Sequence, residues 1–268
     1  MERRQRSDPW ASGDHYEQYV GRWSRPVARE FLRWIDAPPA LDWIDVGCGT
    51  GALTEAILAH AAPNSVKGVD PSPAYLEFAR SRITNDRASF DAADARALPF
   101  EPATYHIAVA GLALNFVPQP AAAVGEMARV VRPGGLVATY VWDYAGKMEL
   151  MRHFWDTAVA LDPAAAALDE GRRFAFCRSG PLESLFIEAG LRNVAARAID
   201  VPTRFQDFDD YWTPFLGGQG PAPGYAMSLT ADRRDVLRER IRSSLPIADD
   251  GALHLIARAW AVRGQRTI

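Results

Sequence analysis

The chain has 268 residues, 48% of them apolar, which is enough to bury one substantial core with a subdomain inserted into it. Its formal net charge of −3 excludes the basic surface on which non-specific nucleic-acid binding depends. Cys48 and Cys177 lie far apart and predict neither a disulfide framework nor a metal site. The charged N-terminus lacks the apolar core of a secretory signal, and no stretch approaches the roughly 20 apolar residues of a membrane span. We therefore expect one cytoplasmic, enzyme-sized unit that binds neither nucleic acid nor a membrane.

The N-terminal half predicts strands that alternate with helices. Residues 42–46 form a short β-prone run that stops at a glycine cluster, and residues 52–62 then have helical character. A second strand covers 65–70, and Pro71 lies at the start of another helix. The remaining expected elements of this half are strands over 88–90, 106–110 and 136–142 and a helix over 121–131. Five strands that alternate with helices predict a doubly wound, mostly parallel α/β sheet.

The second half has a different pattern. The expected elements are helices over 148–161 and 181–189 and strands over 191–201 and 253–262. The first of these strands is expected to end at Pro202, and Thr230 is a candidate N-cap for a further helix. About fifty residues separate the two strands, too many for an ordinary connection in a compact domain, so this insertion is a candidate substrate cap. The aromatic residues that crowd this half form either the core of the cap or the lining of an acceptor pocket.

The strongest local signal is the turn Asp45-Val46-Gly47-Cys48-Gly49-Thr50-Gly51, between a predicted strand and a predicted helix. Glycines there let the backbone turn sharply and approach a ligand without hindrance from a Cβ atom, and the helix N-terminus presents unpaired N–H groups. The turn therefore predicts a nucleotide-like ligand. The kind of nucleotide stays open, because the same residues also satisfy the dinucleotide fingerprint.

Acidic residues after the first three strands narrow the choice of ligand. Asp70 ends the second strand, where a carboxylate can bind the ribose hydroxyls of either NAD or S-adenosylmethionine, or can cap the next helix. Asp45 would repel a pyrophosphate at the glycine turn, whereas a cofactor without phosphates tolerates it. After the third strand, Asp94 can accept the adenine amino group while the N–H of Ala95 meets a ring nitrogen, unless Asp94 is a solvated loop acid. Together these residues favour S-adenosylmethionine over NAD.

In this order, the motifs resemble those of the seven-stranded class I S-adenosylmethionine-dependent methyltransferases, specifically the branch typified by ubiquinone and menaquinone biosynthesis methyltransferases. The matching stretches are 43–54, 68–71, 94–95, 98–100, 105–118 and 126–137. At Leu114-Asn115-Phe116 the sequence departs from that branch, whose members often carry histidines there. The resemblance implies a doubly wound, mostly parallel seven-stranded sheet with helical cap insertions and an antiparallel last strand.

The resemblance also implies a role for each matching residue. The turn that begins at Asp45 would hold the methionine part of the cofactor, Asp70 the ribose and Asp94 the adenine. Related methyltransferases often carry an N-terminal helix, from which Arg22 would reach the cofactor carboxylate. The implied cofactor-binding residues are Asp45, Gly47, Cys48, Gly49, Thr50, Gly51, Asp70, Pro71, Asp94, Ala95, Gly111, Leu112, Tyr19 and Arg22.

These observations divide the chain into three expected parts. Residues 1–40 form an N-terminal helical lid segment, residues 41–142 the cofactor-binding core, and residues 143–268 the last two strands with the inserted cap helices. Tyr19 and Trp23 recur at helical spacing, so a helix would place them on one face. That face would either close over the cofactor or pack on the sheet edge as plain structure.

The expected reaction moves a methyl group to an unidentified small-molecule acceptor by in-line displacement. The methyl group of the cofactor is already activated, so the protein mainly has to exclude water and align the acceptor. No catalytic residue and no metal are assigned. The candidates for a general base, by residue type only, are His15, Tyr16, Asp143, Tyr144 and Tyr211. The alternatives are an NAD-dependent oxidoreductase and a nucleotide-binding module without catalysis.

Overall fold

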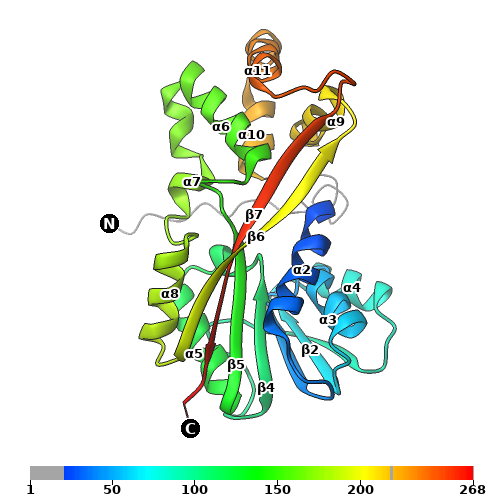
Figure 1. Cartoon of the computed structure of the whole chain (residues 1–268), viewed down its shortest axis with the longest axis vertical. Coiled ribbons are helices and arrows are strands. Elements are labelled where there is room, and N and C mark those ends of the chain that lie inside the picture. Colours follow the sequence, from blue (N-terminus) through cyan, green and yellow to red (C-terminus); the bar gives the residue numbers. More distant parts are fainter. Residues whose placement is uncertain (1–20, 218–219, 268) are drawn as a thin grey trace. The chain divides into compact units, whose positions relative to one another are not determined.

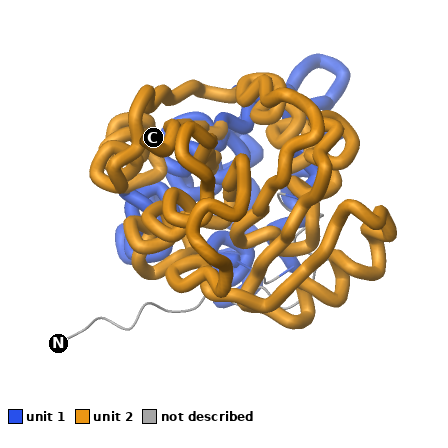
Figure 2. Tube along the Cα trace, turned by 90° about the horizontal axis from the view of Figure 1, so that it is seen from below, with its two compact units in different colours: residues 1–23, 143–175, 200–258 blue, residues 24–142, 176–199, 259–268 orange. Residues whose placement is uncertain are grey.

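The computed structural model describes residues 21–217 and 220–267, and the chain divides into two compact units (Figure 2). Unit 1 comprises residues 1–23, 143–175 and 200–258, and unit 2 comprises residues 24–142, 176–199 and 259–268. Tyr19 and the general-base candidates His15 and Tyr16 lie outside the described residues. Each unit is assembled from segments that are distant in sequence, so neither corresponds to one continuous stretch of chain.

A seven-stranded sheet has the strand order β3-β2-β1-β4-β5-β7-β6 (Figure 1). Its strands are β1 (Asp42–Val46), β2 (Ser65–Asp70), β3 (Ala88–Ala92), β4 (Tyr105–Gly111), β5 (Val131–Trp142), β6 (Arg192–Phe205) and β7 (Leu253–Gln265). Strands β1 to β5 pair in parallel, and β7 pairs with β5 in the antiparallel direction. The predicted doubly wound, mostly parallel sheet with an antiparallel last strand is confirmed. Strand order reverses at β1, the kind of position where open α/β sheets bind ligands.

The central strands are buried, as expected for parallel strands that are covered on both faces. Trp43, Ile44 and Val46 of β1 are buried, and so are residues 107–110 of β4. The strand register pairs Asp45 with Gly68 on β2 and with Val109 on β4. The carboxyl ends of neighbouring strands therefore meet at one edge of the sheet.

Helices pack against this sheet within unit 2. They are α2 (Arg22–Ile35), of which residues 24–35 belong to this unit, α3 (Ala52–His60), α4 (Pro73–Arg82), α5 (Pro120–Val130) and α8 (Ser179–Glu188), with the 3₁₀ turn η2 (Leu114–Phe116). Helix α3 packs against β2, α4 against β2 and β3, and α5 against β4 and β5, with α8 beside α5 (Figure 1). Prolines in the first turn start α4 and α5, because a proline there loses no intrahelical hydrogen bond. At the C-terminal end of α2, Arg263 donates to the carbonyls of Trp34 and Ile35 and so caps the helix.

Two expected strand boundaries are wrong. The strand that should end at Pro202 continues to Phe205 as β6, which is an edge strand of the sheet. Proline is tolerated there because an edge strand leaves some backbone N–H positions unpaired. The strand expected from residue 136 already begins at Val131, which pairs with Tyr105 across a register shift.

Unit 1 is mainly helical and has an aromatic core. Its helices are α6 (Glu149–Leu161), η3 (Pro163–Ala167), α7 (Glu170–Arg173), α9 (Phe208–Trp212), η4 (Thr213–Gly217), α10 (Pro221–Ser228) and α11 (Ala231–Ser244). Phe154, Trp155, Tyr211 and Phe215 are fully buried, and the rings of Phe154 and Phe215 stack with centroids 4.5 Å apart. These aromatic side chains therefore form the core of the unit, which supports the packing interpretation over an open pocket.

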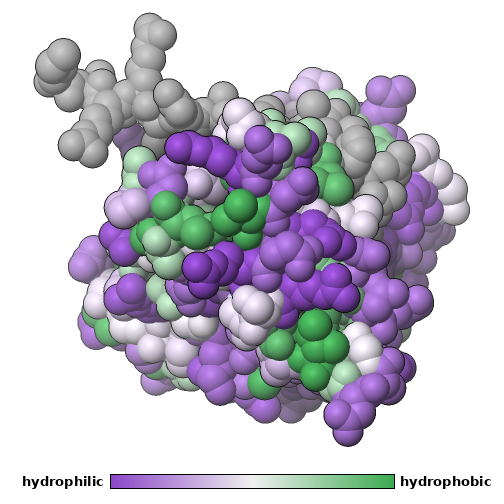
Figure 3. All heavy atoms as spheres, turned by 90° about the horizontal axis from the view of Figure 1, so that it is seen from above, coloured by the Kyte–Doolittle hydropathy of each residue, from purple (hydrophilic) through white to green (hydrophobic). Residues whose placement is uncertain are grey.

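Hydrophilic residues dominate the face of the molecule drawn in Figure 3, where apolar residues form small separate patches. Scattered patches of this size are ordinary on a protein surface. Among the described residues, no helix combines the length and the apolar character needed to span a membrane.

Candidate functional site

The turn after β1 requires glycine at several positions. Gly47, Gly49 and Gly51 have φ values of 74°, 52° and 89°, in the left-handed region that favours glycine. A Cβ atom on Gly47 would lie 2.5 Å from the Cβ of Ala113, whereas a Cβ on Gly49 would meet nothing within 4 Å. The turn therefore packs closely on one side and leaves open space in front of Gly49.

Hydrogen bonds fix this turn against β2 and leave the next helix uncapped. The N–H groups of Gly47 and Cys48 donate to the carbonyl of Val69 at 2.8 and 3.0 Å. Gly51 is the N-cap of α3 and has no side chain that could accept from the first turn of the helix. An uncapped helix N-terminus beside an open glycine turn is suited to bind a polar ligand group.

Asp45 is a fully buried carboxylate at the end of β1. Its Oδ2 accepts a hydrogen bond from Thr54 Oγ1 at 2.7 Å, whereas Oδ1 is buried without a partner among the described residues. Burial, with a smaller contribution from the nearby charge of Asp70, raises the pKa of Asp45 to about 7, although the hydrogen bond from Thr54 acts in the opposite direction. Thr54 was not among the predicted site residues, although a threonine on the buried face of α3 was a detectable signal.

Asp70 joins the glycine turn to the start of α4. Its Oδ2 accepts from the N–H of Gly49 at 3.0 Å and its Oδ1 from the N–H of Ser72 at 2.9 Å. Burial raises the pKa of Asp70, and these two N–H groups act in the opposite direction. Each oxygen of a carboxylate can accept more than one hydrogen bond, so Asp70 keeps capacity for ligand hydroxyls.

Asp94 lies on the loop that follows β3, and a backbone hydrogen bond joins the start of this loop to Asp70. The N–H of Ala93 donates to the carbonyl of Asp70 at 3.3 Å. The exposed carboxylate of Asp94 forms a bidentate pair with Arg96, with Nε–Oδ1 and Nη2–Oδ2 distances of 3.0 and 2.6 Å. This pairing lowers the pKa of Asp94 to about 2, so the carboxylate is ionised at neutral pH. Arg96 was not among the predicted site residues, and any ligand group that binds Asp94 has to share or displace its side chain.

A pair of charged residues on α5 holds the rest of this loop. Glu126 Oε2 accepts from the N–H of Leu98 at 2.7 Å, and Arg129 donates to the carbonyls of Leu98 and Phe100 at 2.9 and 2.8 Å. Glu126 and Arg129 also pair with each other at 2.6 Å. Their spacing of three along a helix was visible in the sequence, but nothing there indicated that they bind this loop.

The end of β4 adds a close approach and a strained residue. A Cβ on Gly111 would lie 2.6 Å from Tyr140 Oη and 3.0 Å from Leu53 Cδ2. The next residue, Leu112, is buried and has a φ of 56°, a rare conformation for a branched side chain. Such strain is concentrated at functional sites, and Leu112 directly follows the strand that pairs with β1.

Unit 2 therefore brings most of the predicted cofactor residues to one edge of the sheet. The carboxyl ends of the neighbouring strands β1, β2, β3 and β4 carry, in turn, Asp45 with the glycine turn, Asp70 with Pro71, Asp94 with Ala95, and Gly111 with Leu112.

Arg22 belongs to unit 1, where its guanidinium lies against two aromatic rings that meet edge to face. Its Cζ is 4.6 Å from the ring centroids of both Trp23 and Phe205, and Nη1 pairs with Asp210 at 3.0 Å. The other edge of the guanidinium, Nε and Nη2, is buried without a hydrogen-bond partner among the described residues. That edge has the geometry for bidentate binding of a carboxylate.

The edge of unit 2 fits S-adenosylmethionine better than a dinucleotide. The unpartnered Oδ1 of Asp45 requires a hydrogen-bond donor, which an ammonium group supplies and a phosphate does not. The open space at Gly49 admits a ligand, and Asp70 has free capacity for hydroxyl donors. Three carboxylates at this edge oppose a pyrophosphate and favour a positively charged ligand.

Comparison with known proteins agrees with this geometry. Residues 44–139 match the family model described as a methyltransferase domain. Over 155 residues the chain is 40% identical to methyltransferase GfsG of Streptomyces halstedii, which covers 47% of this chain and 55% of the relative. Over 113 residues it is 34% identical to the demethylmenaquinone methyltransferase of Bacillus cytotoxicus, covering 41% and 48% of the two chains. The chain thus spans about half the length of these curated relatives.

Solved structures of methyltransferases have a similar fold. The phosphoethanolamine N-methyltransferase 2 of Haemonchus contortus, solved in complex with S-adenosyl-L-methionine, superposes with a TM-score of 0.59 at 13% identity, covering 95% of this chain and 56% of that one. At this identity the similarity establishes the fold. Residues 44–139 are thus similar to a methyltransferase domain, and the seven-stranded sheet that contains them has the fold of a solved methyltransferase that binds S-adenosyl-L-methionine.

Proposed function

We propose that this protein transfers the methyl group of S-adenosylmethionine to a small-molecule acceptor. The observation that carries the proposal is the set of three carboxylates at the carboxyl ends of neighbouring strands: Asp45 near the end of β1, Asp70 as the last residue of β2, and Asp94 just after β3. Asp45 and Asp70 are buried there, and burying carboxylates beside one another is costly unless a ligand or hydrogen-bond donors compensate. A cationic ligand without phosphates supplies that compensation, whereas NAD would add negative charge.

The proposed contacts assign one part of the cofactor to each strand end. The glycine turn and Asp45 bind the methionine part, Asp70 binds the ribose hydroxyls, and Asp94 with Ala95 binds the adenine. Arg22 belongs to unit 1, and its contact with the cofactor carboxylate remains a prediction from the resemblance.

When bound, the cofactor supplies a sulfonium-activated methyl group, whose bond to sulfur breaks as the bond to the acceptor forms. The chain contributes by orienting that methyl group, for which the strained backbone at Leu112 and the close packing at Gly111 provide rigidity. A general base is not assigned. Tyr211 is unsuited to that role, because it is fully buried and its hydroxyl donates to the carbonyl of Leu150 at 2.8 Å. The Asp143 carboxylate accepts from the N–H of Lys147 at 3.0 Å, which assigns it a structural role at the start of α6.

Unit 1 is proposed to supply the acceptor contacts. Two observations support this assignment. The strand-end loops of unit 2 are already committed to the cofactor in the assignment above. Unit 1 has its own aromatic core and its own buried ion pair between Arg152 and Asp169 at 2.9 Å, so its surface can vary without unfolding the cofactor site.

Titration calorimetry with S-adenosylmethionine, S-adenosylhomocysteine and NAD tests the cofactor assignment directly. We expect micromolar binding of the first two and none of NAD. Incubation with methyl-labelled cofactor and a panel of phenols, carboxylic acids and amines then tests transfer, with mass spectrometry detecting a gain of one methyl group. Stronger binding of NAD, together with nicotinamide absorbance changes on turnover, would show an oxidoreductase instead. Saturable cofactor binding without transfer to any acceptor would favour a binding module.

A further inference from the structure

Unit 2 contains a cavity of about 430 Å³ that lies outside the cofactor edge. Its lining residues come from α2, from the loop after α2, from β1 and from the end of α3: Arg29, Leu32, Arg33, Asp36, Ala37, Trp43, His60 and Ala61. The volume is within the range of small-molecule sites, about 300 to 1,000 Å³. None of the lining residues belongs to the glycine turn or follows the carboxyl end of a strand.

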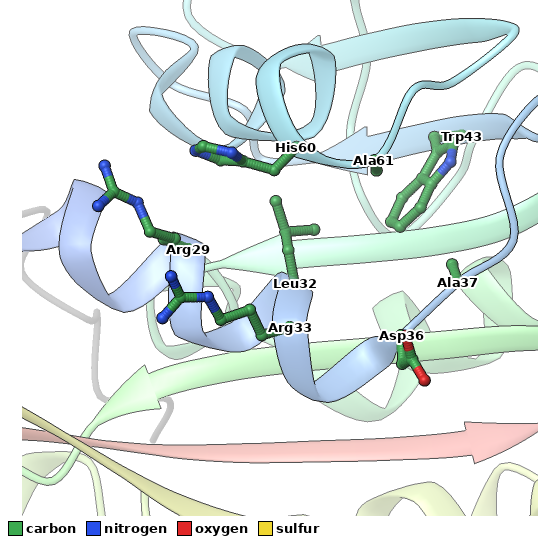
Figure 4. A pocket seen from close by; sticks show the side chains of 8 residues that line it. All are labelled: Arg29, Leu32, Arg33, Asp36, Ala37, Trp43, His60 and Ala61. Carbon is green, nitrogen blue, oxygen red and sulfur yellow. The ribbon is translucent and has the colours of Figure 1, made fainter.

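The cavity is basic at one end and apolar at the other (Figure 4). Arg29, Arg33 and His60 gather at one end, whereas Trp43 lies at the opposite end with Leu32 and Ala61 between them (Figure 4). The Asp36 carboxylate points away from the basic end in the same view. The cavity therefore combines a positively charged group with an apolar wall, as a site for an amphipathic anion requires.

The charged groups at the basic end are incompletely paired. Arg33 pairs with Glu30 at 2.5 Å, but Arg29 and His60 make no ion pair or hydrogen bond with any described residue. At the other end the fully buried indole of Trp43 adds to the apolar lining of the cavity.

This cavity and the cofactor edge lie at opposite ends of β1. Trp43 is the second residue of that strand, and Gly47, the first glycine of the turn, directly follows its last residue, Val46. Because a strand rises about 3.3 Å per residue, Trp43 and Gly47 are about 13 Å apart along the strand axis. A ligand in the cavity therefore does not have to compete with the cofactor.

We propose that this cavity binds a small carboxylate with an apolar body. Its carboxylate pairs with Arg29, and Arg33 and His60 add donors beside it. The apolar body lies along Leu32 and Ala61 toward the indole of Trp43. Arginine is the natural partner for a carboxylate, since its planar fork binds both oxygens. The site is independent of the acceptor proposed above, and it survives if methyl transfer is not found.

Titration calorimetry with octanoate tests the proposal, with saturating S-adenosylhomocysteine present so that octanoate does not bind at the cofactor edge. Acetate has the charge of octanoate without the chain, and 1-octanol has the chain without the charge. We expect octanoate to bind at least about tenfold more tightly than either, because each lacks one of the two interactions. Equal binding of octanol and octanoate, or no detectable octanoate binding, would overturn the proposal.

Variants locate the bound molecule. Arg29→Glu reverses the exposed charge and should weaken octanoate binding by at least about tenfold, and Arg29→Gln should give a smaller loss. Ala61→Leu fills the apolar part of the cavity and should also abolish binding. Ala59→Leu adds the same volume at an exposed position of α3 that does not line the cavity, so it should bind octanoate like the wild type. Melting temperatures near that of the wild type confirm folding. Wild-type affinity in both Arg29→Glu and Ala61→Leu would overturn the assignment.

Discussion

Replacing Arg129 with leucine is expected to loosen the loop over residues 94–100, which contains the proposed adenine site, while leaving the glycine turn intact. Arg129 is the donor that ties α5 to the carbonyls of Leu98 and Phe100. Glu126 would keep its hydrogen bond from the N–H of Leu98 but lose its cation. The loop from Asp94 to Phe100 would then retain one of its three hydrogen bonds to α5.

The magnitude follows from the two lost hydrogen bonds. A hydrogen bond from a charged donor contributes about 1.5 to 3 kcal/mol when it is shielded from water. The Arg129 side chain is 32% exposed, so we discount each bond to about 1 kcal/mol. We expect the free energy of unfolding to fall by about 2 kcal/mol. Ligand binding must then restore loop order at a cost of about 1 kcal/mol, which weakens the affinity for S-adenosylhomocysteine roughly fivefold.

Three measurements separate this effect from general destabilisation. Urea unfolding gives the stability change, hydrogen exchange reports opening of residues 94–100, and calorimetry gives the affinity for S-adenosylhomocysteine. The matched control is Arg132→Leu, since Arg132 is also an exposed arginine near the end of α5 but contacts His106 and Asp42 instead of the loop. If Arg129→Leu and Arg132→Leu gave the same hydrogen exchange in residues 94–100 and the same affinity, the loop would not depend on Arg129 and the reasoning would be refuted.

Other variants probe the remaining parts of the site and of unit 1. Asp70→Ala should weaken the binding of S-adenosylmethionine and S-adenosylhomocysteine by roughly 1 to 3 kcal/mol in calorimetry, through lost charge-assisted hydrogen bonds; equal affinity would contradict the ribose assignment. Gly47→Ala should lower the free energy of unfolding by about 2 to 4 kcal/mol in urea titrations, because its φ is 74° and the new Cβ meets Ala113. Burial raises the pKa of Glu170 to about 7, from 4.5 when exposed, so the folded state holds that proton more tightly and stability falls as pH rises between these values. Glu170→Gln should therefore reduce the decrease in stability between pH 4.5 and 7, and an unchanged pH dependence would exclude Glu170 as its source.

Sequence patterns grouped the candidate cofactor residues because they encode strand ends. A parallel sheet places the carboxyl ends of its strands at one edge, so residues that follow different strands become neighbours without any direct sequence relation. Asp45, Asp70 and Asp94 could be grouped for that reason alone. The glycine spacing added the turn, whose conformations only glycine adopts readily, as Gly47 and Gly51 illustrate.

The supporting contacts could not be predicted in the same way, because they depend on packing between elements. Arg96 is two residues from Asp94, yet only the loop conformation decides that it binds the carboxylate instead of solvent. Glu126 and Arg129 read from the sequence as an ordinary helical pair, and their contact with Leu98 follows from how α5 lies against the sheet. The course of β6 through Pro202 likewise depended on its position at the sheet edge, which no local pattern specifies.

The charged groups near the two ends of β1 give the two proposed sites opposite ligand preferences. At the carboxyl end of the strand, Asp45 and Asp70 create a negative environment, which suits a sulfonium and disfavours phosphates. Near the amino end, the unpaired Arg29 guanidinium faces the cavity and suits a carboxylate. Because Arg29 on α2 lies at the cavity near the amino end of β1, whereas Asp45 and Asp70 lie at the carboxyl ends of their strands, a cationic and an anionic ligand can bind the same unit at once. Raising the ionic strength should then weaken both, the more exposed site at Arg29 most.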